Sequence, residues 1–180
     1  MEQITTERLI LRQWKLSDSG DLYEYAKSDL VGPNAGWKQH KSEEESKKII
    51  KMFIDANETY AVVLKEENKV IGSIGIHKRE ANNNLNEREI GYVLNPKYWG
   101  NGYIPEAVQA LLEYGFNTMN LDLIWCVHFD FNERSKRVIE KCGFNFKYRK
   151  EKKLTLLDNK EVIALFYNIS KEEYKNDCKY

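Results

Sequence analysis

One segment, residues 89–114, does most to limit what this chain can fold into. Its sequence predicts a strand, then a turn holding Gly100 and Gly102, then a helix that begins near Pro105. The first N–H groups of a helix have no partner within the helix, and the helix dipole adds partial positive charge there. Glycine lets the backbone approach an anion closely, because it has no Cβ atom. The segment therefore predicts a binding site for a ligand that carries phosphate.

The pattern of apolar residues along the chain predicts a single α+β domain over residues 1–180. The expected order is a strand, two helices, three antiparallel strands, a helix, a strand, a helix and two strands. This order favours a mixed, mostly antiparallel sheet with helices on both faces over a doubly wound sheet. The expected strands are residues 8–14, 60–64, 70–76, 89–94, 123–129, 144–153 and 161–167.

Helix signals complete this assignment. A helix is expected from the cap at residues 17–18 to residue 27, and others over residues 105–117 and 133–141. Ser42 and Glu45 predict a capping box that starts a further helix. Residues 30–40 and 81–86 are expected to be loops, and the end of the chain a polar tail. The apolar run 123–129 predicts a strand covered on both faces.

Composition excludes several classes of protein. Lys and Arg together equal Asp and Glu, 28 against 28, so we expect no binding to nucleic acid through overall charge. The cysteines, Cys126, Cys142 and Cys178, lack the spacing of a metal site or a disulfide framework, so free thiols and no metal are expected. Residues 1–11 contain no continuous apolar segment, so we expect neither a signal peptide nor a membrane span. We therefore expect a cytoplasmic location.

Three interpretations compete for the turn around Gly100 and Gly102. A phosphate-binding P-loop would end in Gly-Lys-Ser or Gly-Lys-Thr, which this turn lacks. A dinucleotide-binding fingerprint would need a third glycine, where Pro105 stands, and a parallel strand unit. The residues around the turn support a third interpretation, which rests on a resemblance.

The chain resembles the GNAT superfamily of acyl-CoA N-acyltransferases over nearly its whole length. It is most similar to the ribosomal-protein N-terminal acetyltransferases of the RimJ/RimL kind. The segments that carry this resemblance share an order and a spacing. They are Thr6-Glu-Arg-Leu-Ile-Leu-Arg12, Ile71-Gly72, Glu89-Ile-Gly-Tyr92, Tyr98-Trp-Gly-Asn-Gly-Tyr103, Glu106-Ala107, Asn132-x-x-Ser135 and Glu140-Lys-Cys-Gly-Phe144.

The resemblance implies a GNAT-like fold and acetyl-CoA as co-substrate. It implies that backbone amides of the turn wrap the CoA diphosphate, and that a bulge splays the preceding strand from its neighbour. The splayed strand would then pair with the pantetheine arm, while Asn132 and Ser135 touch the pantetheine and the sulfur end. The cofactor residues implied are Tyr92, Val93, Leu94, Trp99, Gly100, Asn101, Gly102, Tyr103, Ile104, Asn132 and Ser135.

Two positions depart from the family's usual turn. Trp99 stands where Arg or Gln is usual, and Ile104 where Gly or Ala is usual. Trp is familiar in the RimJ/RimL branch, whereas Ile104 is bulkier than the family pattern. Pro105 removes one amide donor, although proline is well tolerated in the first turn of a helix. We expect CoA binding to survive these changes.

The implied reaction is direct attack of a neutral amine on the acetyl thioester. Glu89 is our candidate for the base that removes the amine's proton, directly or through water; the alternative is a solvated carboxylate. Many GNAT enzymes protonate the leaving thiolate with a tyrosine four residues after the Ser135 position, where this chain has Ile139. Ser135 is our first candidate for that role, and a cap of the helix is its alternative. His128 is expected to be a hydrogen-bonded core histidine.

The acceptor is expected to be a primary amine. In line with the RimJ/RimL resemblance, it could be the N-terminal amine of a protein. A small-molecule amine (an antibiotic or a polyamine) and a catalytically silent CoA-binding regulatory module remain as alternatives. The loop that lines the acceptor side in relatives holds Trp37 and His40, our candidate substrate contacts, each with simple packing or exposure as its alternative. A homodimer through the sheet edge near the C-terminus is left open.

Overall fold

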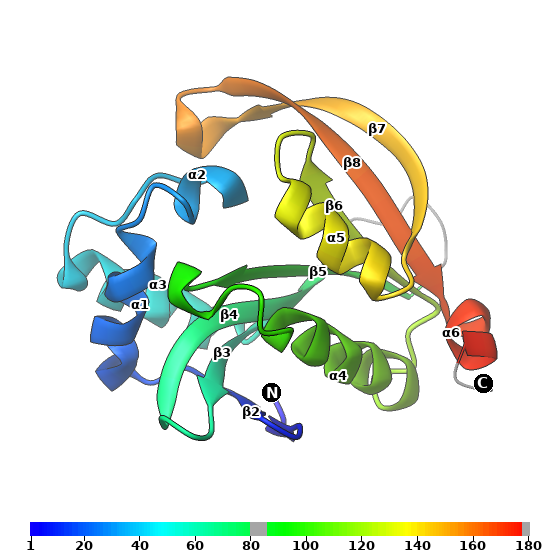
Figure 1. Ribbon diagram of the computed structural model, residues 1–180, viewed down its shortest axis with the longest axis horizontal. Helices are drawn as coiled ribbons and strands as arrows, with labels where there is room; N and C mark the ends of the chain where they lie inside the picture. The colour runs from blue at the N-terminus through cyan, green and yellow to red at the C-terminus, as the bar shows by residue number, and fades with distance from the viewer. Residues whose placement is uncertain (80–85, 178–180) are drawn as a thin grey trace.

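The protein, seen here in a computed structural model that describes residues 1–79 and 86–177, is built on one eight-stranded sheet (Figure 1). The strand order is β1-β2-β3-β4-β5-β6-β8-β7, and among these strands only β5 and β6 run parallel. The strands are β1 (Ile4–Thr5), β2 (Leu9–Arg12), β3 (Thr59–Leu64), β4 (Lys69–Lys78), β5 (Glu87–Leu94), β6 (Leu123–Phe129), β7 (Asn145–Leu154) and β8 (Lys160–Ser170). The predicted mixed, mostly antiparallel α+β fold is confirmed.

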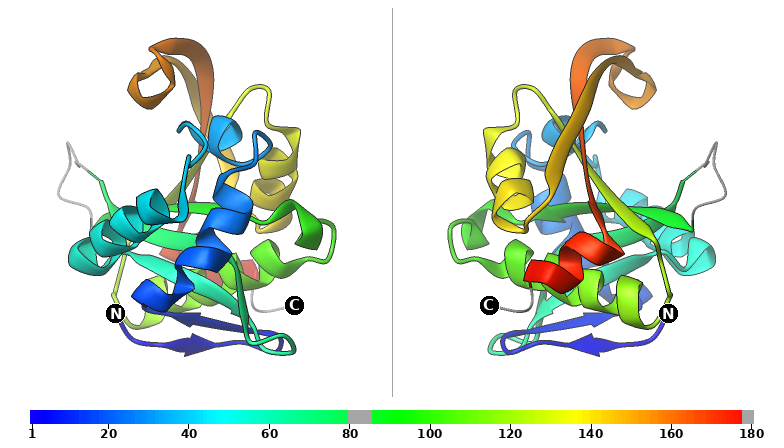
Figure 2. Two further views of the ribbon diagram at one scale, coloured as in Figure 1. Left: turned by 90° about the vertical axis from the view of Figure 1, so that its left-hand side faces the viewer. Right: turned by 90° about the vertical axis from the view of Figure 1, so that its right-hand side faces the viewer.

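Helices cover both faces of the sheet, as predicted (Figures 1 and 2). The described helices are α1 (Ser19–Ala26), α2 (Gly32–Ala35), α3 (Glu43–Ala56), α4 (Tyr103–Asn117), α5 (Glu133–Lys141) and α6 (Lys171–Asp177), with 3-10 turns η1 (Leu16–Asp18), η2 (Pro96–Tyr98) and η3 (Thr155–Leu157). The helices α4 and α5 bury their apolar sides against one face, and α1 and α3 against the other. No described helix is both long and apolar enough to cross a bilayer.

The central strand β3 contributes side chains to two hydrophobic cores, one on each face of the sheet. Because side chains alternate along a strand, Val62 joins the core under α4, while Ala61 and Val63 join the core under α1 and α3. All six residues of β3 are buried, because both of its faces are covered. On α4, Val108, Leu111, Leu112 and Phe116 recur at helical spacing and are at most 1% exposed.

Four details of the sequence assignment are wrong. The strand β6 alternates buried and partly exposed residues instead of being covered on both faces. Residues 30–40 include the short helix α2, and the expected polar tail forms α6, which packs Tyr174 on Phe116 of α4 with ring centroids 5.0 Å apart. The side chain of Ser42 caps α3 as predicted, but the Glu45 carboxylate accepts from the N–H of Lys41, so the capping box is incomplete. The expected loop at residues 81–86 falls, except for Asn86, outside the described residues.

The feature of the sheet that positions the site is the divergence of β5 from β6. These strands pair from Glu87↔Leu123 to Ile90↔Cys126, and beyond that point no described strand pairs with β5 on this side. On its other side β5 keeps an unbroken register with β4 from Lys78↔Arg88 to Gly72↔Leu94, so no bulge interrupts that pairing. The sheet is therefore open between β6 and the part of β5 that follows Ile90, as the expected splaying requires. The hairpin of β7 and β8 extends beyond the body of the sheet as an arm whose end lies near α2 (Figure 1).

Candidate active site

The turn between β5 and α4 has the backbone geometry of an anion site. Gly100 and Gly102 both adopt left-handed backbone angles, with φ of +82° and +78°, which a residue with a Cβ atom adopts only with strain. The helix α4 begins at Tyr103, two residues earlier than the sequence predicts, so Pro105 is the third helical residue. No described residue accepts a hydrogen bond from the N–H groups of residues 100–104. These amides can therefore bind an anionic ligand.

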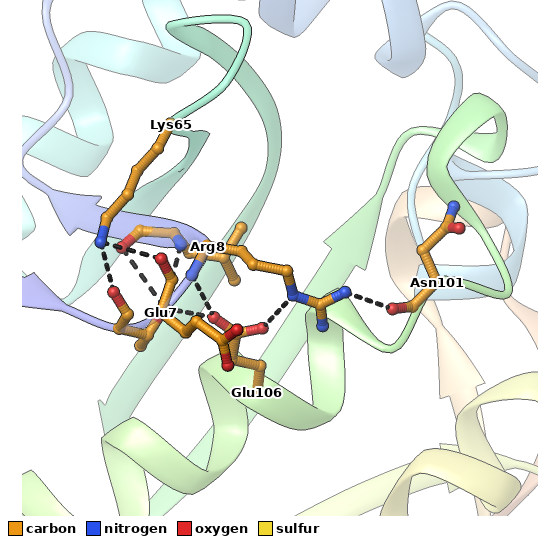
Figure 3. A network of polar contacts seen from close by, with 7 residues as sticks. Glu7, Arg8, Lys65, Asn101 and Glu106 are labelled. Carbon is orange, nitrogen blue, oxygen red and sulfur yellow. Dashed lines mark hydrogen bonds and ion pairs between the residues drawn. The ribbon is translucent and has the colours of Figure 1, made fainter.

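A polar network fixes this turn to the N-terminal hairpin (Figure 3). Arg8 donates through Nε to the Glu106 carboxylate at 2.7 Å and through a terminal nitrogen to the carbonyl of Asn101 at 2.9 Å. Glu106 also accepts from the hydroxyl of Thr6 at 2.5 Å and the N–H of Arg8 at 2.9 Å. Burial raises the pKa of Glu106, but these hydrogen bonds outweigh that effect and lower it. Lys65 donates to the carbonyls of Thr6 and Glu7 on the other side of the hairpin.

Where β5 and β6 diverge, a cleft of about 1280 Å³ runs from the glycine turn to the loops around α2. Sites for one small ligand are usually about 300–1,000 Å³, so this cleft has room for two ligands. Of the predicted cofactor residues, all but Asn101 line it. The carbonyl of Leu94 already accepts from the indole N–H of Trp99 at 3.0 Å, which fixes Trp99 beside the turn.

The start of α5 forms the opposite wall of the cleft. The Asn132 side chain accepts from the N–H of Ser135 at 3.1 Å, as an N-cap, and donates to the carbonyl of Asn34 in α2. The Ser135 hydroxyl lies 3.0 Å from the Tyr92 hydroxyl, so β5 and α5 are joined across the cleft. Asn132 and Ser135 thus come together as the sequence predicts, and Asn132 connects the two ends of the cleft.

Basic residues of α5 were missed by the sequence reasoning. Arg134, Arg137 and Lys141 all line the cleft. The guanidinium of Arg134 stacks over the Trp99 ring at 4.3 Å, so this cation lies beside the glycine turn. The signal was available, because residues three and seven positions apart share one face of a helix. Arg134 therefore adds positive charge to the end of the cleft that already presents free amides.

Glu89 lies in the cleft but is already engaged in an ion pair. One of its oxygens accepts from Arg79 at 2.9 Å, and Arg79 also stacks over the Trp125 ring at 4.2 Å. Its side chain is 36% exposed, so its carboxylate remains accessible to water. The arrangement allows Glu89 to accept a proton through its second oxygen or through a water molecule.

Trp37 and His40 both line the end of the cleft near α2. Their rings lie in contact, with centroids 5.2 Å apart. The Nδ1 atom of His40 is hydrogen-bonded to the Ser46 hydroxyl at 2.8 Å, and only 8% of His40 is exposed. Burial lowers the pKa of His40, so the ring is neutral near pH 7. His40 supports the wall of the cleft, and Trp37 is the more accessible of the two.

Three other sequence expectations have clear positions. Ile139 is fully buried in the core under α4. Because its side chain is a hydrocarbon, it cannot protonate the leaving thiolate as the usual tyrosine would. His128 is buried and bonded to the Phe129 carbonyl and the Tyr167 hydroxyl, which confirms a core histidine. Cys126 and Cys142 are buried free thiols, while Cys178 lies outside the described residues. In the described ranges no group of His, Cys, Asp or Glu is arranged to hold a metal ion.

Comparisons with known proteins agree with this geometry. The model of the acetyltransferase (GNAT) domain matches residues 8–145. An uncharacterized N-acetyltransferase of Bacillus subtilis, YnaD, is 35% identical over 178 residues, which are 95% of this chain and 98% of that protein. The crystal structure of a GNAT-family acetyltransferase from Bacillus anthracis superposes with a TM-score of 0.85 at 31% identity, covering 95% of this chain and 99% of that one.

A ribosomal-protein-S5-alanine acetyltransferase from Vibrio fischeri shares the fold, with a TM-score of 0.74 at 22% identity and coverage of 96% and 98%. At that identity the likeness concerns the fold alone, so the RimJ/RimL branch is not established by it. The family match spans most of the chain and includes the glycine turn. The chain therefore belongs to the GNAT family of acetyltransferases, enzymes that transfer the acetyl group of acetyl-CoA to an amine.

Proposed function

We propose that this enzyme acetylates a primary amine next to an apolar group, such as a protein N-terminal amine, by direct attack on acetyl-CoA. The observation that carries this proposal is a single cleft that joins two unlike ends. One end presents unbonded backbone amides and cations, which suit phosphate. The other end presents aromatic and aliphatic side chains, which suit an apolar acceptor.

At the donor end, the diphosphate of CoA binds the amides of residues 100–104, and Trp99 flanks it. The pantetheine arm lies along the free edge of Tyr92–Leu94, in the manner of an added strand. Asn132 and Ser135 then face its thioester end. Support for this placement comes from the divergence of β5 and β6 and from the lining of the cleft.

For the reaction, the amine must lose a proton before its nitrogen can attack. Glu89 is the proposed base, acting directly or through water, since it lies in the cleft with one oxygen free of Arg79. Ser135 is the proposed donor of a hydrogen bond to the leaving sulfur. Ile139 is excluded from that role by its side chain, which has no proton to give.

The charged residues around the acceptor end favour a peptide amine over a polycationic acceptor. Two cations, Lys38 and Lys152, line this end beside two acids, Glu45 and Glu89, and both acids already have hydrogen-bond partners. A polyamine or a polycationic antibiotic would need an excess of free carboxylates. Leu30 and Leu156, 47% and 66% exposed, instead offer apolar contacts at the mouth. A peptide end fits this surface, and the Vibrio fischeri neighbour, named for a ribosomal protein, adds support.

Assembly and location complete the proposal. The edge strand β7 carries Lys or Arg at five of its ten positions, which disfavours pairing with a second sheet edge, so we propose a monomer over the homodimer. We also propose a cytoplasmic location, in keeping with the buried, unpaired Cys126 and Cys142.

A screen of acetyl-CoA turnover tests the choice of acceptor. Thiol release is measured with short peptides that vary in their first residue, with spermidine and with an aminoglycoside, all at one concentration. Peptides with an apolar first residue are expected to react fastest. Faster turnover of either polycation than of every peptide would overturn the proposed acceptor class while leaving acetyl transfer intact.

A further inference from the structure

The hydroxyl of Tyr92 reaches from β5 to the first turn of α5, where it meets Ser135. It lies 3.1 Å from the carbonyl oxygen of Ser135 and 3.0 Å from the Ser135 hydroxyl. Both residues line the cleft at the point where β5 has left β6. The structure therefore couples a phenol to the side chain that we propose to face the leaving sulfur.

The two contacts allow two arrangements of hydrogen atoms, because a phenol has a single proton. In the first, Tyr92 donates to the Ser135 carbonyl, and the Ser135 hydroxyl donates back to the phenol oxygen. In the second, Tyr92 donates to the Ser135 hydroxyl oxygen, and the proton of Ser135 is free to point into the cleft. The first arrangement satisfies both contacts when no ligand is bound; the second, in which the phenol proton turns from the carbonyl to the Ser135 hydroxyl oxygen, gives Ser135 a proton to offer a ligand.

We infer that Tyr92 is a positioning residue for the acetyl transfer, which holds the Ser135 hydroxyl with its proton directed at the departing sulfur. The inference rests on the proposed function of Ser135. It answers the question raised by Ile139, which lies in the core and cannot donate. The two hydroxyl groups that donate hydrogen bonds come instead from Tyr92 on β5 and from Ser135 in the first turn of α5.

The step balances without a further reactant. The amine nitrogen forms a bond to the acetyl carbon, and its extra proton goes to Glu89 or to water. The bond between that carbon and sulfur breaks, and its electron pair stays on sulfur. The Ser135 hydroxyl donates a hydrogen bond to this thiolate while Tyr92 donates to Ser135, and the thiolate later takes its proton from water. Neither hydroxyl loses its proton.

The surroundings of Tyr92 suit a group that keeps its proton. Burial raises the pKa of Tyr92 well above its usual value, and the nearby thiols Cys126 and Cys142 act in the same direction. Burial also raises the pKa of Cys126 on β6 and of Cys142 just after α5, so both thiols are neutral. The phenol remains a hydrogen-bond donor across the range in which the enzyme is assayed.

A double-mutant cycle tests this inference. Tyr92→Phe, Ser135→Ala and the double variant are assayed by thiol release with whichever amine the wild type acetylates fastest. We expect kcat to fall about 10-fold for Tyr92→Phe and about 30-fold for Ser135→Ala, and the double variant to match Ser135→Ala alone. The affinity for acetyl-CoA, measured by calorimetry, is expected to stay within about 2-fold in all three.

The control is Tyr60→Phe, which removes another buried phenol hydroxyl that has no hydrogen-bond partner among the described residues. It is expected to leave kcat unchanged. A double variant whose loss equals the product of the two single losses would overturn the inference, because it would show that Tyr92 acts apart from Ser135. A normal kcat for Tyr92→Phe alone would also overturn it, with the role of Ser135 intact. A normal kcat for Ser135→Ala would instead remove the proposed role of Ser135 itself.

Discussion

The two ends of the cleft are built in different ways. The donor end is a short stretch of backbone, residues 99–104, whose shape is set by left-handed glycines and secured by Arg8 and Glu106. The acceptor end is assembled from α1, α2, α3 and the arm, whose side chains meet only in the folded molecule. One contact between the arm and the loop after α2, from Lys38 to Asp158, is an exposed ion pair.

This difference separates what each end can recognise. Backbone amides bind any phosphate of suitable geometry, so the donor end is suited to an invariant co-substrate. Side chains on loops determine the shape and polarity of the acceptor end, so a few substitutions there can change the acceptor. The following predictions test whether the two ends are as separable as the structure indicates.

The largest effect is expected at the donor turn. Gly102→Glu would place a side chain at a left-handed position and a negative charge beside the amides of the turn, where it competes with phosphate. We expect acetyl-CoA affinity to fall at least about 100-fold by calorimetry. Gly20→Glu on α1, where an added Cβ atom would meet nothing within 4 Å, is the matched control. Normal CoA binding by a folded Gly102→Glu protein would show that the turn is not the phosphate site.

The next effect concerns the chemical step. Glu89→Gln keeps the size of the side chain but removes its capacity to accept a proton, so we expect kcat to fall about 100-fold. The affinity for acetyl-CoA should not change, because Glu89 lies apart from the turn. Glu161→Gln, in an exposed ion pair on the arm, serves as the control. An unchanged kcat for Glu89→Gln would mean that the carboxylate does not act as the base and serves only in the ion pair with Arg79.

A smaller effect is expected from loosening the donor turn. Glu106→Gln removes the charge that Arg8 and Thr6 bind, while the backbone amides of the turn remain. We expect acetyl-CoA affinity to fall about 5-fold and the free energy of unfolding to fall by about 1–2 kcal/mol. The control is Glu113→Gln, an exposed residue of the same helix. Loss of stability without loss of affinity would mean that the network supports the fold but not the turn.

At the acceptor end, Trp37→Ala is expected to raise the KM for the amine about 5-fold and to leave acetyl-CoA affinity unchanged. The reason is that Trp37 lines the cleft beside α2, away from the glycine turn. Trp37→Phe should retain most of the affinity, since it keeps an aromatic wall. If both ligands bound less tightly to Trp37→Ala, the two ends would be coupled.

The smallest effect is one of stability against pH. Side-chain hydrogen bonds from Lys69 and Lys97 lower the pKa of Glu24 from 4.5 to about 2, tying α1 to β4 and η2. A lowered pKa stabilises the fold above pH 4.5, and this contribution is lost as pH falls toward 2. Glu24→Gln should therefore cost about 1 kcal/mol at pH 7, a modest figure for a partly exposed group, and close to nothing at pH 2. Equal costs at both pH values in urea titrations would contradict this assignment.

The donor end could be predicted from sequence because its determinants are local. Gly100 and Gly102 define the turn, Asn132 caps α5 three residues before the N–H it binds, and both strands of the opening were placed correctly. The expected splaying of β5 from β6 agrees with the end of their pairing at Ile90, and no bulge interrupts the register of β5 with β4. The contact of Arg8 with the turn was missed, because it joins positions 93 residues apart.

The acceptor end was harder to predict because its determinants are far apart in the sequence. The helix α2 has four residues with Pro33 among them, too few for a periodic pattern. The bond between Tyr92 and Ser135 depends on how β5 and α5 pack, and no spacing along the chain encodes it. The arm brings Leu154 and Leu156 to the cleft from a distant part of the sequence. Such contacts are known only once the sheet order is known.

The most direct test of the account is a crystal structure of this protein with CoA. We predict that the diphosphate lies within hydrogen-bond distance of the N–H groups of residues 100–104, and that the thiol lies between β5 and the start of α5. A diphosphate bound elsewhere, with these amides facing only water, would contradict it.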